Sequence, residues 1–243
     1  MSAPAVSRNS TRNSTHVIAQ GLVALPGLHS RPVVFVVDED ASVRESLERL
    51  ISCHGWQPVT FASAHAFLRR PRGVVPNCLV LDVSPSDISG LDLQKRVAIE
   101  RPDLPIIFIA SRIDVRTTVQ AMKAGAVEFF TKPFRDDVLV STIREAIERN
   151  RNALGYEAEM QMLRDCYTSL SPRERQVMRL VVSGLLNKQV GGELGISERT
   201  VKAHRGQVMQ KMKADSLADL VKIAVRLELA PTINPWRMAR DVD

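Results

Sequence analysis

The chain has 243 residues, enough for two domains of ordinary size, and 44% of them are hydrophobic, as in other folded proteins. Its apolar runs are far shorter than the roughly 18 residues that a membrane helix needs, so we expect no membrane span. The net charge of +6 is unevenly spread: residues 31–150 hold 16 basic and 16 acidic side chains, whereas residues 168–230 hold 11 and 6. The basic C-terminal segment favours a polyanion as partner.

The N-terminus and the cysteines indicate where the protein works. Residues 1–30 are rich in Ser, Thr and Asn and hold no acidic residue, which predicts a disordered extension; a transit peptide is less favoured, because the segment has few arginines. The three cysteines are widely spaced and form no CxxC pair. Reduced thiols are the rule in the cytosol, so we expect a cytoplasmic protein.

Strand-like and helix-like patterns alternate over residues 31–149. The apolar runs that predict strands are Val33–Val37, Val59–Phe61, Cys78–Asp82, Ile106–Ile109 and Val127–Thr131. Each is followed by apolar residues at helical spacing, with expected caps or stops at Gly55, Ser63, Asp114, Gly125 and Asp136. Five such units with short loops predict an α/β doubly wound fold, with parallel strands and helices on both faces.

Charged residues follow three of these strands. Asp82 ends a run that is otherwise wholly apolar, Asp38-Glu39-Asp40 follows the first run, and Lys132-Pro133 follows the last. Ligands of open α/β sheets bind at the carboxyl ends of the strands. The sequence therefore predicts a site at Asp82, with carboxylates and one ammonium gathered around it.

Residues 150–167 predict a linker, either helical or flexible, and helical periodicity dominates residues 168–230. Ser171-Pro172-Arg173-Glu174 is a capping box that predicts a strong helix start. Two helices, Asn187–Leu194 and Glu198–Met212, are expected on either side of a turn at Gly195-Ile196. A last helix, Ser216–Leu229, should carry Leu217, Leu220, Val221, Ala224 and Leu227 on one side, and residues 231–243 form a tail.

Two short helices joined by a glycine-containing turn favour a helix-turn-helix DNA reader. On the second helix Val201, Val208 and Met212 share one face, which we expect to be core. The opposite face is basic with small residues in its middle, and it holds Arg199, Lys202, Ala203, Gly206, Gln210 and Lys213. Arg, Lys and Gln can contact base edges and phosphates, although a solvated helix face is the competing interpretation.

Both halves of the chain resemble known domains. Asp38-Glu39, Asp82, Lys132-Pro133 and the five β-α units resemble a two-component response-regulator receiver domain, which is flavodoxin-like. Leu170–Glu174, Gly184, Asn187-Lys188 and Gly195–His204 resemble the LuxR-type helix-turn-helix. Their order on one chain is similar to the NarL/FixJ class of transcription regulators, over about residues 31–230.

The resemblance implies a phosphorylation switch. Asp82 would accept a phosphoryl group from a sensor histidine kinase, with Mg²⁺ held by Asp38, Glu39 and Asp82, and Lys132 would pair with the phosphoryl oxygens. Phe129 would change rotamer, and the Lys132-Pro133 bond would be cis. Lys188 and Thr200 join the expected contacts with promoter DNA. The phosphorylated chain would act as a homodimer, with RNA polymerase as a further partner, and not as an enzyme.

Several residues depart from the family pattern. Ala110 stands where Thr or Ser usually binds the phosphoryl group, with Ser111 next, and Ser86 stands where proline is usual. These departures keep open an atypical receiver that serves as a phosphorylation-independent dimerisation module. A phosphohydrolase is a third alternative, but Ser84 replaces the acid/base carboxylate that such chemistry needs. The dimer could form through residues 115–149, through the last helix, or through both.

Overall fold

The computed structural model describes Gly27 and residues 30–71, Gly73, 75–83, 90–112 and 115–229. The expected N-terminal extension up to residue 26, the C-terminal tail, Ser84, Ser86 and the expected cap Asp114 lie outside these residues. The chain divides into two compact units, with the boundary between Tyr156 and Glu157. None of the described helices is long and apolar enough to cross a membrane.

The first unit is built on five parallel strands in the order β2-β1-β3-β4-β5. The strands are β1 (Val33–Val37), β2 (Gln57–Phe61), β3 (Asn77–Asp82), β4 (Ile106–Ala110) and β5 (Glu128–Thr131). The helices are α2 (Ala41–Cys53), α3 (Ala64–Leu68), α4 (Gly90–Glu100), α5 (Val115–Lys123) and α6 (Asp136–Thr168). The predicted doubly wound fold is confirmed. The chain reverses its winding direction between β1 and β3, which is where ligands bind in such sheets.

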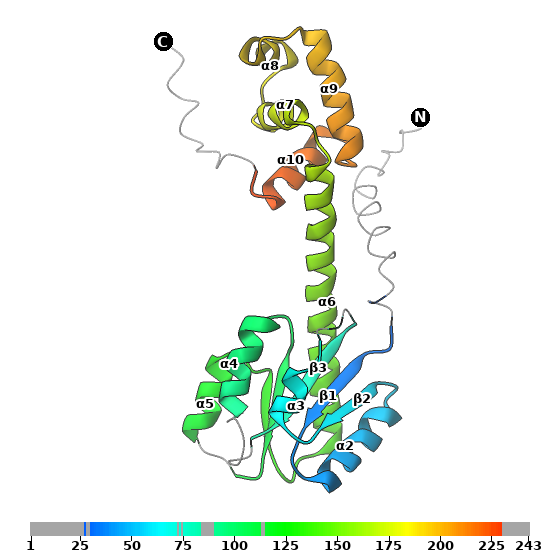
Figure 1. The fold of residues 1–243 in the computed structure, drawn as a ribbon, viewed down its shortest axis with the longest axis vertical. Helices are drawn as coiled ribbons and strands as arrows, with labels where there is room; N and C mark the ends of the chain where they lie inside the picture. The colour runs from blue at the N-terminus through cyan, green and yellow to red at the C-terminus, as the bar shows by residue number, and fades with distance from the viewer. Residues whose placement is uncertain are drawn as a thin grey trace, which may run out of the picture. The chain divides into compact units, whose positions relative to one another are not determined.

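Helices cover both faces of this sheet, with α3, α4 and α5 on one face and α2 and α6 on the other (Figure 1). Alternate residues of β1 are buried on opposite faces of the sheet. Val33, Phe35 and Val37 pack toward α3, α4 and α5, and Val34 and Val36 pack toward α2 and α6. This two-sided burial explains the unbroken apolar runs, because a strand covered on both faces has no polar side.

The second unit consists of helices α7 (Pro172–Val182), α8 (Asn187–Leu194), α9 (Glu198–Lys211) and α10 (Leu217–Arg226), together with the last turns of α6. The predicted capping box is confirmed, since Ser171 Oγ accepts the N–H of Glu174 and the Glu174 carboxylate accepts the N–H of Ser171. Ser197 and Ser216 cap α9 and α10 by accepting the N–H of Thr200 and of Asp219. On the expected apolar side of α10, Leu220 and Ala224 are buried and Val221 and Leu227 pack against the core, whereas Leu217, the first residue of the helix, is 39% exposed.

Helix α6 continues through the residues expected to form the linker, for which the sequence left a helical or a flexible form open. It runs without interruption for 33 residues, so the expected linker at residues 150–167 is helical. Its apolar residues change partners along its length: Leu139, Ile143 and Ile147 pack on the sheet, whereas Cys166 and Tyr167 pack against the core of the second unit. Glu159 also forms a bidentate ion pair with Arg226 of α10, in which the two guanidinium nitrogens donate to the two carboxylate oxygens at 2.6 and 2.7 Å.

Candidate functional site

Three charged side chains meet at the carboxyl end of the sheet. Asp38 follows β1, Asp82 ends the neighbouring strand β3, and Lys132 follows β5. The ammonium of Lys132 lies 2.8 Å from Asp38 Oδ2 and 2.9 Å from Asp82 Oδ1. The predicted cluster of carboxylates around one ammonium therefore exists, and the bond between Lys132 and Pro133 is cis, as the resemblance implied.

The acidic residues after β1 have separate environments. Asp38 is buried, and its Oδ1 accepts the N–H of Asp40 at 2.8 Å. Asp40 caps α2 by accepting the N–H of Ser42. Glu39 is exposed, and Arg44 donates to the backbone carbonyls of Asp38 and Glu39 at 2.7 and 2.9 Å. The backbone of this loop is thus fixed from both ends, with Asp38 directed inward.

Burial and neighbouring charges set the protonation of the cluster. Burial is the largest cause that raises the pKa of Asp82; Lys132 opposes it, and the charges of Asp38 and Glu39 raise it further. Burial works to lower the pKa of Lys132, but its bonds to Asp38 and Asp82 raise that pKa overall. A carboxylate with a raised pKa beside a persistent cation is a nucleophile whose own charge is balanced.

The raised pKa of Asp82 predicts a pH-dependent stability. The folded chain binds the proton more tightly than the unfolded chain, so the free energy of unfolding should fall as pH rises from the ordinary carboxyl value of 3.8 through the raised pKa. In Asp82→Asn this fall should be absent, with a difference of about 1.4 kcal/mol for each unit by which the pKa is raised. Urea unfolding of both chains from pH 4 to 8 in EDTA measures it, and a pH-independent difference would contradict it.

The remaining predicted residues of this site lie on β4 and β5. Ala110 is buried, and its carbonyl accepts the N–H of Lys132 at 2.8 Å. Strand β4 ends there, and Ser111 follows as an exposed residue outside the strand. Phe129 is half-buried, and its ring stacks on Phe108 with 6.0 Å between centroids. The methyl group of Ala110 therefore leaves the end of β4 without a hydroxyl group.

Helices α8 and α9 form the predicted helix-turn-helix, and two glycines determine the geometry of the turn. Gly195 ends α8 with φ +64°, a left-handed conformation that favours glycine. Gly191 is the close-contact position, because a Cβ built there would lie 2.7 Å from the carbonyl oxygen of Ile196. Sequence reasoning missed Gly191; its signal was a glycine inside a predicted helix, four residues before the turn glycine.

We expect Gly191→Ala to destabilise the second unit by about 1–3 kcal/mol, because the added methyl group meets backbone that cannot rotate away. Gly192→Ala is the matched control: its Cβ would have nothing within 4 Å, and alanine should stabilise the helix by about 0.5–1 kcal/mol. Calorimetry of the full chain measures both changes. Equal effects of the two substitutions would show that the close contact has no energetic role.

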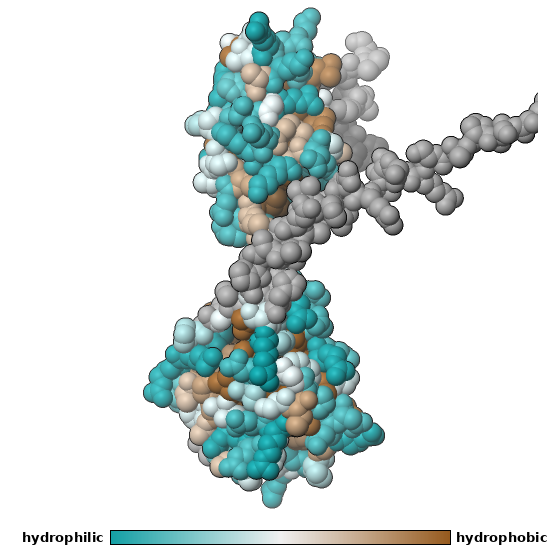
Figure 2. Space-filling model, turned by 90° about the vertical axis from the view of Figure 1, so that its right-hand side faces the viewer, coloured by the Kyte–Doolittle hydropathy of each residue, from teal (hydrophilic) through white to brown (hydrophobic). Residues whose placement is uncertain are grey.

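The two faces of α9 are as predicted except at Lys213, because the helix ends at Lys211. Val201, Val208 and Met212 are buried in the core of the second unit. The opposite face consists of Arg199, Lys202, Ala203, Gly206 and Gln210, all of them exposed. Lys213 is also exposed, but it follows the end of α9 at Lys211 and has φ +54°, so it does not continue this helical face. Thr200 is also exposed, with its hydroxyl 2.8 Å from Ser197 Oγ, and Lys188 is exposed on α8. The visible surface of this unit is largely hydrophilic, with small apolar patches (Figure 2).

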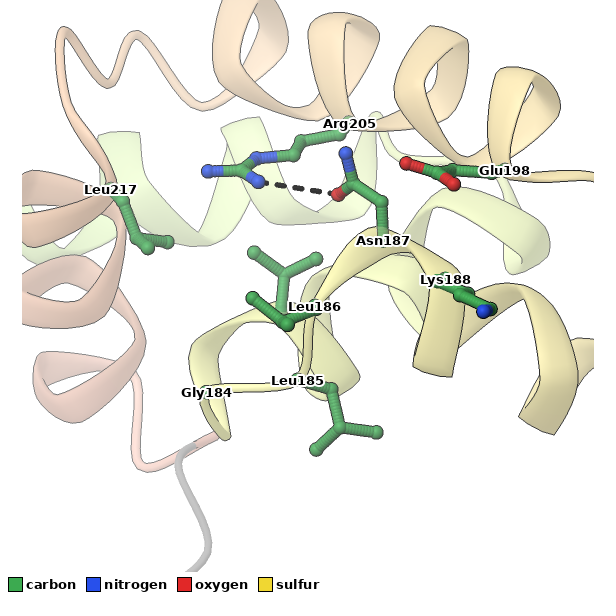
Figure 3. Close-up of a pocket in the computed structure, with 9 residues that line it drawn as sticks. Gly184, Leu185, Leu186, Asn187, Lys188, Glu198, Arg205 and Leu217 are labelled. Carbon is green, nitrogen blue, oxygen red and sulfur yellow. Dashed lines mark hydrogen bonds between the residues drawn. The ribbon is translucent and has the colours of Figure 1, made fainter.

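A cavity of about 450 Å³ lies beside the helix-turn-helix (Figure 3). Its lining comes from α7, α8, α9, α10 and the loop before α8, and it includes Leu185, Leu186, Lys188, Glu198, Arg205 and Leu217. Arg205 donates to Asn187 Oδ1 at 3.2 Å across it, which joins α9 to the start of α8. Leu186 occupies the N-cap position of α8 without a side-chain cap and is 71% exposed.

Comparison with known domain families divides the chain in the same way. Residues 34–144 match the response regulator receiver domain, and residues 168–224 match the bacterial regulatory proteins of the luxR family. The first range contains the cluster of Asp38, Asp82 and Lys132, and the second contains both helices of the helix-turn-helix.

Several curated proteins share both parts. Nodulation protein W of Bradyrhizobium diazoefficiens is 45% identical over 83% of this chain and 88% of its own length. Response regulator protein TmoT of Ectopseudomonas mendocina is 43% identical over 81% and 89%. Transcriptional regulatory protein FixJ of B. diazoefficiens is 41% identical over 79% and 94%. Among solved structures, the response regulator StyR matches with a TM-score of 0.76 and 42% identity, over 81% of this chain and 100% of that one.

Proposed function

This chain belongs to the response-regulator transcription factors of the NarL/FixJ class, and from that premise we propose that phosphorylation of Asp82 controls its binding to DNA. The observation that carries the proposal is the ammonium of Lys132 within 3 Å of both Asp38 and Asp82. A sensor histidine kinase would supply the phosphoryl group, and the protein would work in the cytoplasm as a regulator that turns over no substrate.

The chain's own residues divide the work of phosphoryl acceptance. Asp82 Oδ attacks phosphorus, and the leaving group departs in line with the attacking oxygen. Lys132 balances the charge of Asp82 beforehand and can pair with a phosphoryl oxygen afterwards. The modified side chain carries about −1.5 to −2 charges, which draws the ammonium from Asp38 toward the new group.

We propose that Mg²⁺ assists this step, bound by Asp38 and Asp82 with Glu39 at the exposed side. No three acidic, histidine or cysteine side chains of the described residues gather closely enough to hold a metal by themselves. The donor set nevertheless fits, because two carboxylates already face one cation at 2.8 and 2.9 Å and hard oxygen donors suit Mg²⁺. Bound there, the ion would offset the negative charge of the incoming phosphoryl oxygens.

Two exposed apolar surfaces support a homodimer. On α5 the exposed large apolar residues are Val115, Val119 and Met122, and Val138 of α6 is exposed as well. On α10 Leu217 and Val225 are exposed at positions eight residues apart, on the same side of the helix. A change of the Phe129 rotamer would alter the edge strand beside α5 and so favour the first surface on phosphorylation.

In the second unit, we propose that the exposed face of α9 enters the major groove of promoter DNA, with Lys188 and Thr200 at its margin. RNA polymerase is the further partner that we expect at regulated promoters. Exposed Leu186 and the adjoining cavity offer RNA polymerase a surface. Helix α9 contributes Glu198 and Arg205 to that cavity, and neither residue belongs to the proposed DNA-reading face.

A gel-shift titration with and without acetyl phosphate and Mg²⁺ tests the proposal, with mass spectrometry of Asp82 on the same samples. The phosphorylated chain should bind its promoter about 5- to 150-fold more tightly, since allosteric couplings commonly amount to about 1–3 kcal/mol. Unmodified Asp82 together with equal affinities would favour the second candidate, a phosphorylation-independent dimerisation module. That candidate is motivated by Ala110, which offers no hydroxyl group to a phosphoryl oxygen.

A further inference from the structure

One buried polar side chain in the first unit has no role in the cluster around Asp82. Gln94 of α4 is 2% exposed, and its neighbours Leu93 and Val97 on the same helix are buried apolar residues. Its amide nitrogen donates to the backbone carbonyl of Ala121 on α5 at 2.9 Å, and this bond is itself buried. Gln94 therefore ties α4 to α5 at a place shielded from water.

The other end of this amide is unsatisfied. Gln94 Oε1 is buried and accepts no hydrogen bond in the part of the chain that the structure describes. Leaving a buried acceptor without a donor is unfavourable, whereas an apolar side chain of the same size would fill the site without that penalty. The stability of this arrangement alone therefore does not account for a glutamine at this position.

The two helices that Gln94 joins connect the proposed phosphorylation site with the proposed dimer surface. Helix α4 begins at Gly90, shortly after Asp82 in the chain, and α5 presents Val115, Val119 and Met122 to solvent. The carbonyl of Ala121 also accepts the N–H of Ala126, just before β5. The Gln94 amide thus bonds to the carbonyl at which α5 is joined to the strand that carries Phe129.

We propose that Gln94 is a positioning residue that transmits phosphorylation of Asp82 to the apolar surface of α5. Its bond to Ala121 makes α5 follow any shift of α4, and its unsatisfied oxygen favours a rearranged state in which Oε1 finds a donor. A polar clamp of this kind offers a second route of coupling in a chain whose Ala110 has no hydroxyl group. The inference rests on the proposed phosphorylation of Asp82.

Gln94→Met tests the clamp, because methionine matches glutamine in length and removes both ends of the amide; Gln94→Leu is the second variant should the first fail to fold. Gln120→Met, an exposed position on α5, is the matched control. For each chain, sedimentation gives the dimer dissociation constant with and without acetyl phosphate and Mg²⁺. Mass spectrometry of the same samples gives the extent of Asp82 phosphorylation.

All three chains should be phosphorylated equally. We expect phosphorylation to tighten the dimer at least tenfold in the parent chain and in Gln120→Met, and less than threefold in Gln94→Met. An unchanged tightening in Gln94→Met overturns the inference. If Asp82 of the parent chain takes no phosphate, the proposed phosphorylation switch is wrong. Hydrogen exchange of the α5 amides then tests by itself whether Gln94 holds α5 in place. Faster exchange in Gln94→Met supports the clamp, and equal exchange overturns it.

Discussion

Asp82→Asn should abolish the phosphoryl acceptance of this chain and, with it, the phosphate-dependent gain in DNA affinity. The amide has no nucleophilic oxygen anion. Among the described residues, the other carboxylate that pairs with Lys132 at a strand end is Asp38, which is buried. The fold should persist, because asparagine keeps the shape of the side chain and removes a partly buried charge. The cost of burying that charge is what raises the pKa of Asp82. Acetyl phosphate labelling with intact-mass measurement, followed by promoter binding, checks both parts.

Asp137→Asn is the matched control for this substitution. Asp137 is an exposed aspartate at the start of α6 that pairs with Arg135, and the same chemical change there should leave labelling and DNA affinity unaltered. Genome-wide mapping of bound DNA for the parent chain and Asp82→Asn extends the comparison to the cell. Identical maps and identical promoter output would refute a phosphorylation switch and leave a constitutive DNA-binding protein.

Arg199→Ala and Lys202→Ala should each weaken promoter binding about 10- to 100-fold, since a base-edge contact commonly contributes 1–3 kcal/mol. Both side chains are exposed on the face of α9 opposite Val201 and Val208, so the fold should not change. A substitution that removes a phosphate contact should also reduce the salt slope of binding by about one, whereas loss of a base contact should relax sequence preference. Fluorescence anisotropy at several salt concentrations separates the two.

Lys222→Ala controls for the loss of one positive charge from the same unit. Lys222 is exposed on α10, not on α9, and pairs with Asp219 at 3.8 Å. Its removal should change DNA affinity by less than about threefold, in keeping with the small contribution of exposed charges. If Lys222→Ala weakened binding as much as Arg199→Ala, the effect would reflect overall charge, and the proposed reading face would be wrong.

Most of the fold was predictable because local chemistry and tertiary packing agree. The strands of the first unit are covered on both sides, so Val33–Val37 and Ile106–Ala110 appear in the sequence as unbroken apolar runs. The predicted caps Ser63 and Ser171 each mark a helix start by accepting the N–H of the residue three positions later, a local spacing that the sequence shows. The cluster of Asp38, Asp82 and Lys132 followed because strand ends of a parallel sheet share one edge.

The features that were missed depend on contacts between residues far apart in the sequence or on packing that has no local signal. The bond from Gln94 to Ala121 joins two helices and has no periodic signature. The close approach at Gly191 depends on how α8 meets the turn after it. The length of α6 was open because its apolar residues serve the sheet first and then the second unit, which breaks a single helical stripe.

The division of α9 into two faces has a consequence for how such a protein can acquire new targets. Residues that hold the helix in place, Val201, Val208 and Met212, are separate from the side chains that would meet the bases. Exchanging only the outward residues should therefore redirect the protein to another promoter without loss of stability. Duplicated genes could diverge in target choice through a handful of substitutions while keeping the same phosphorylation input.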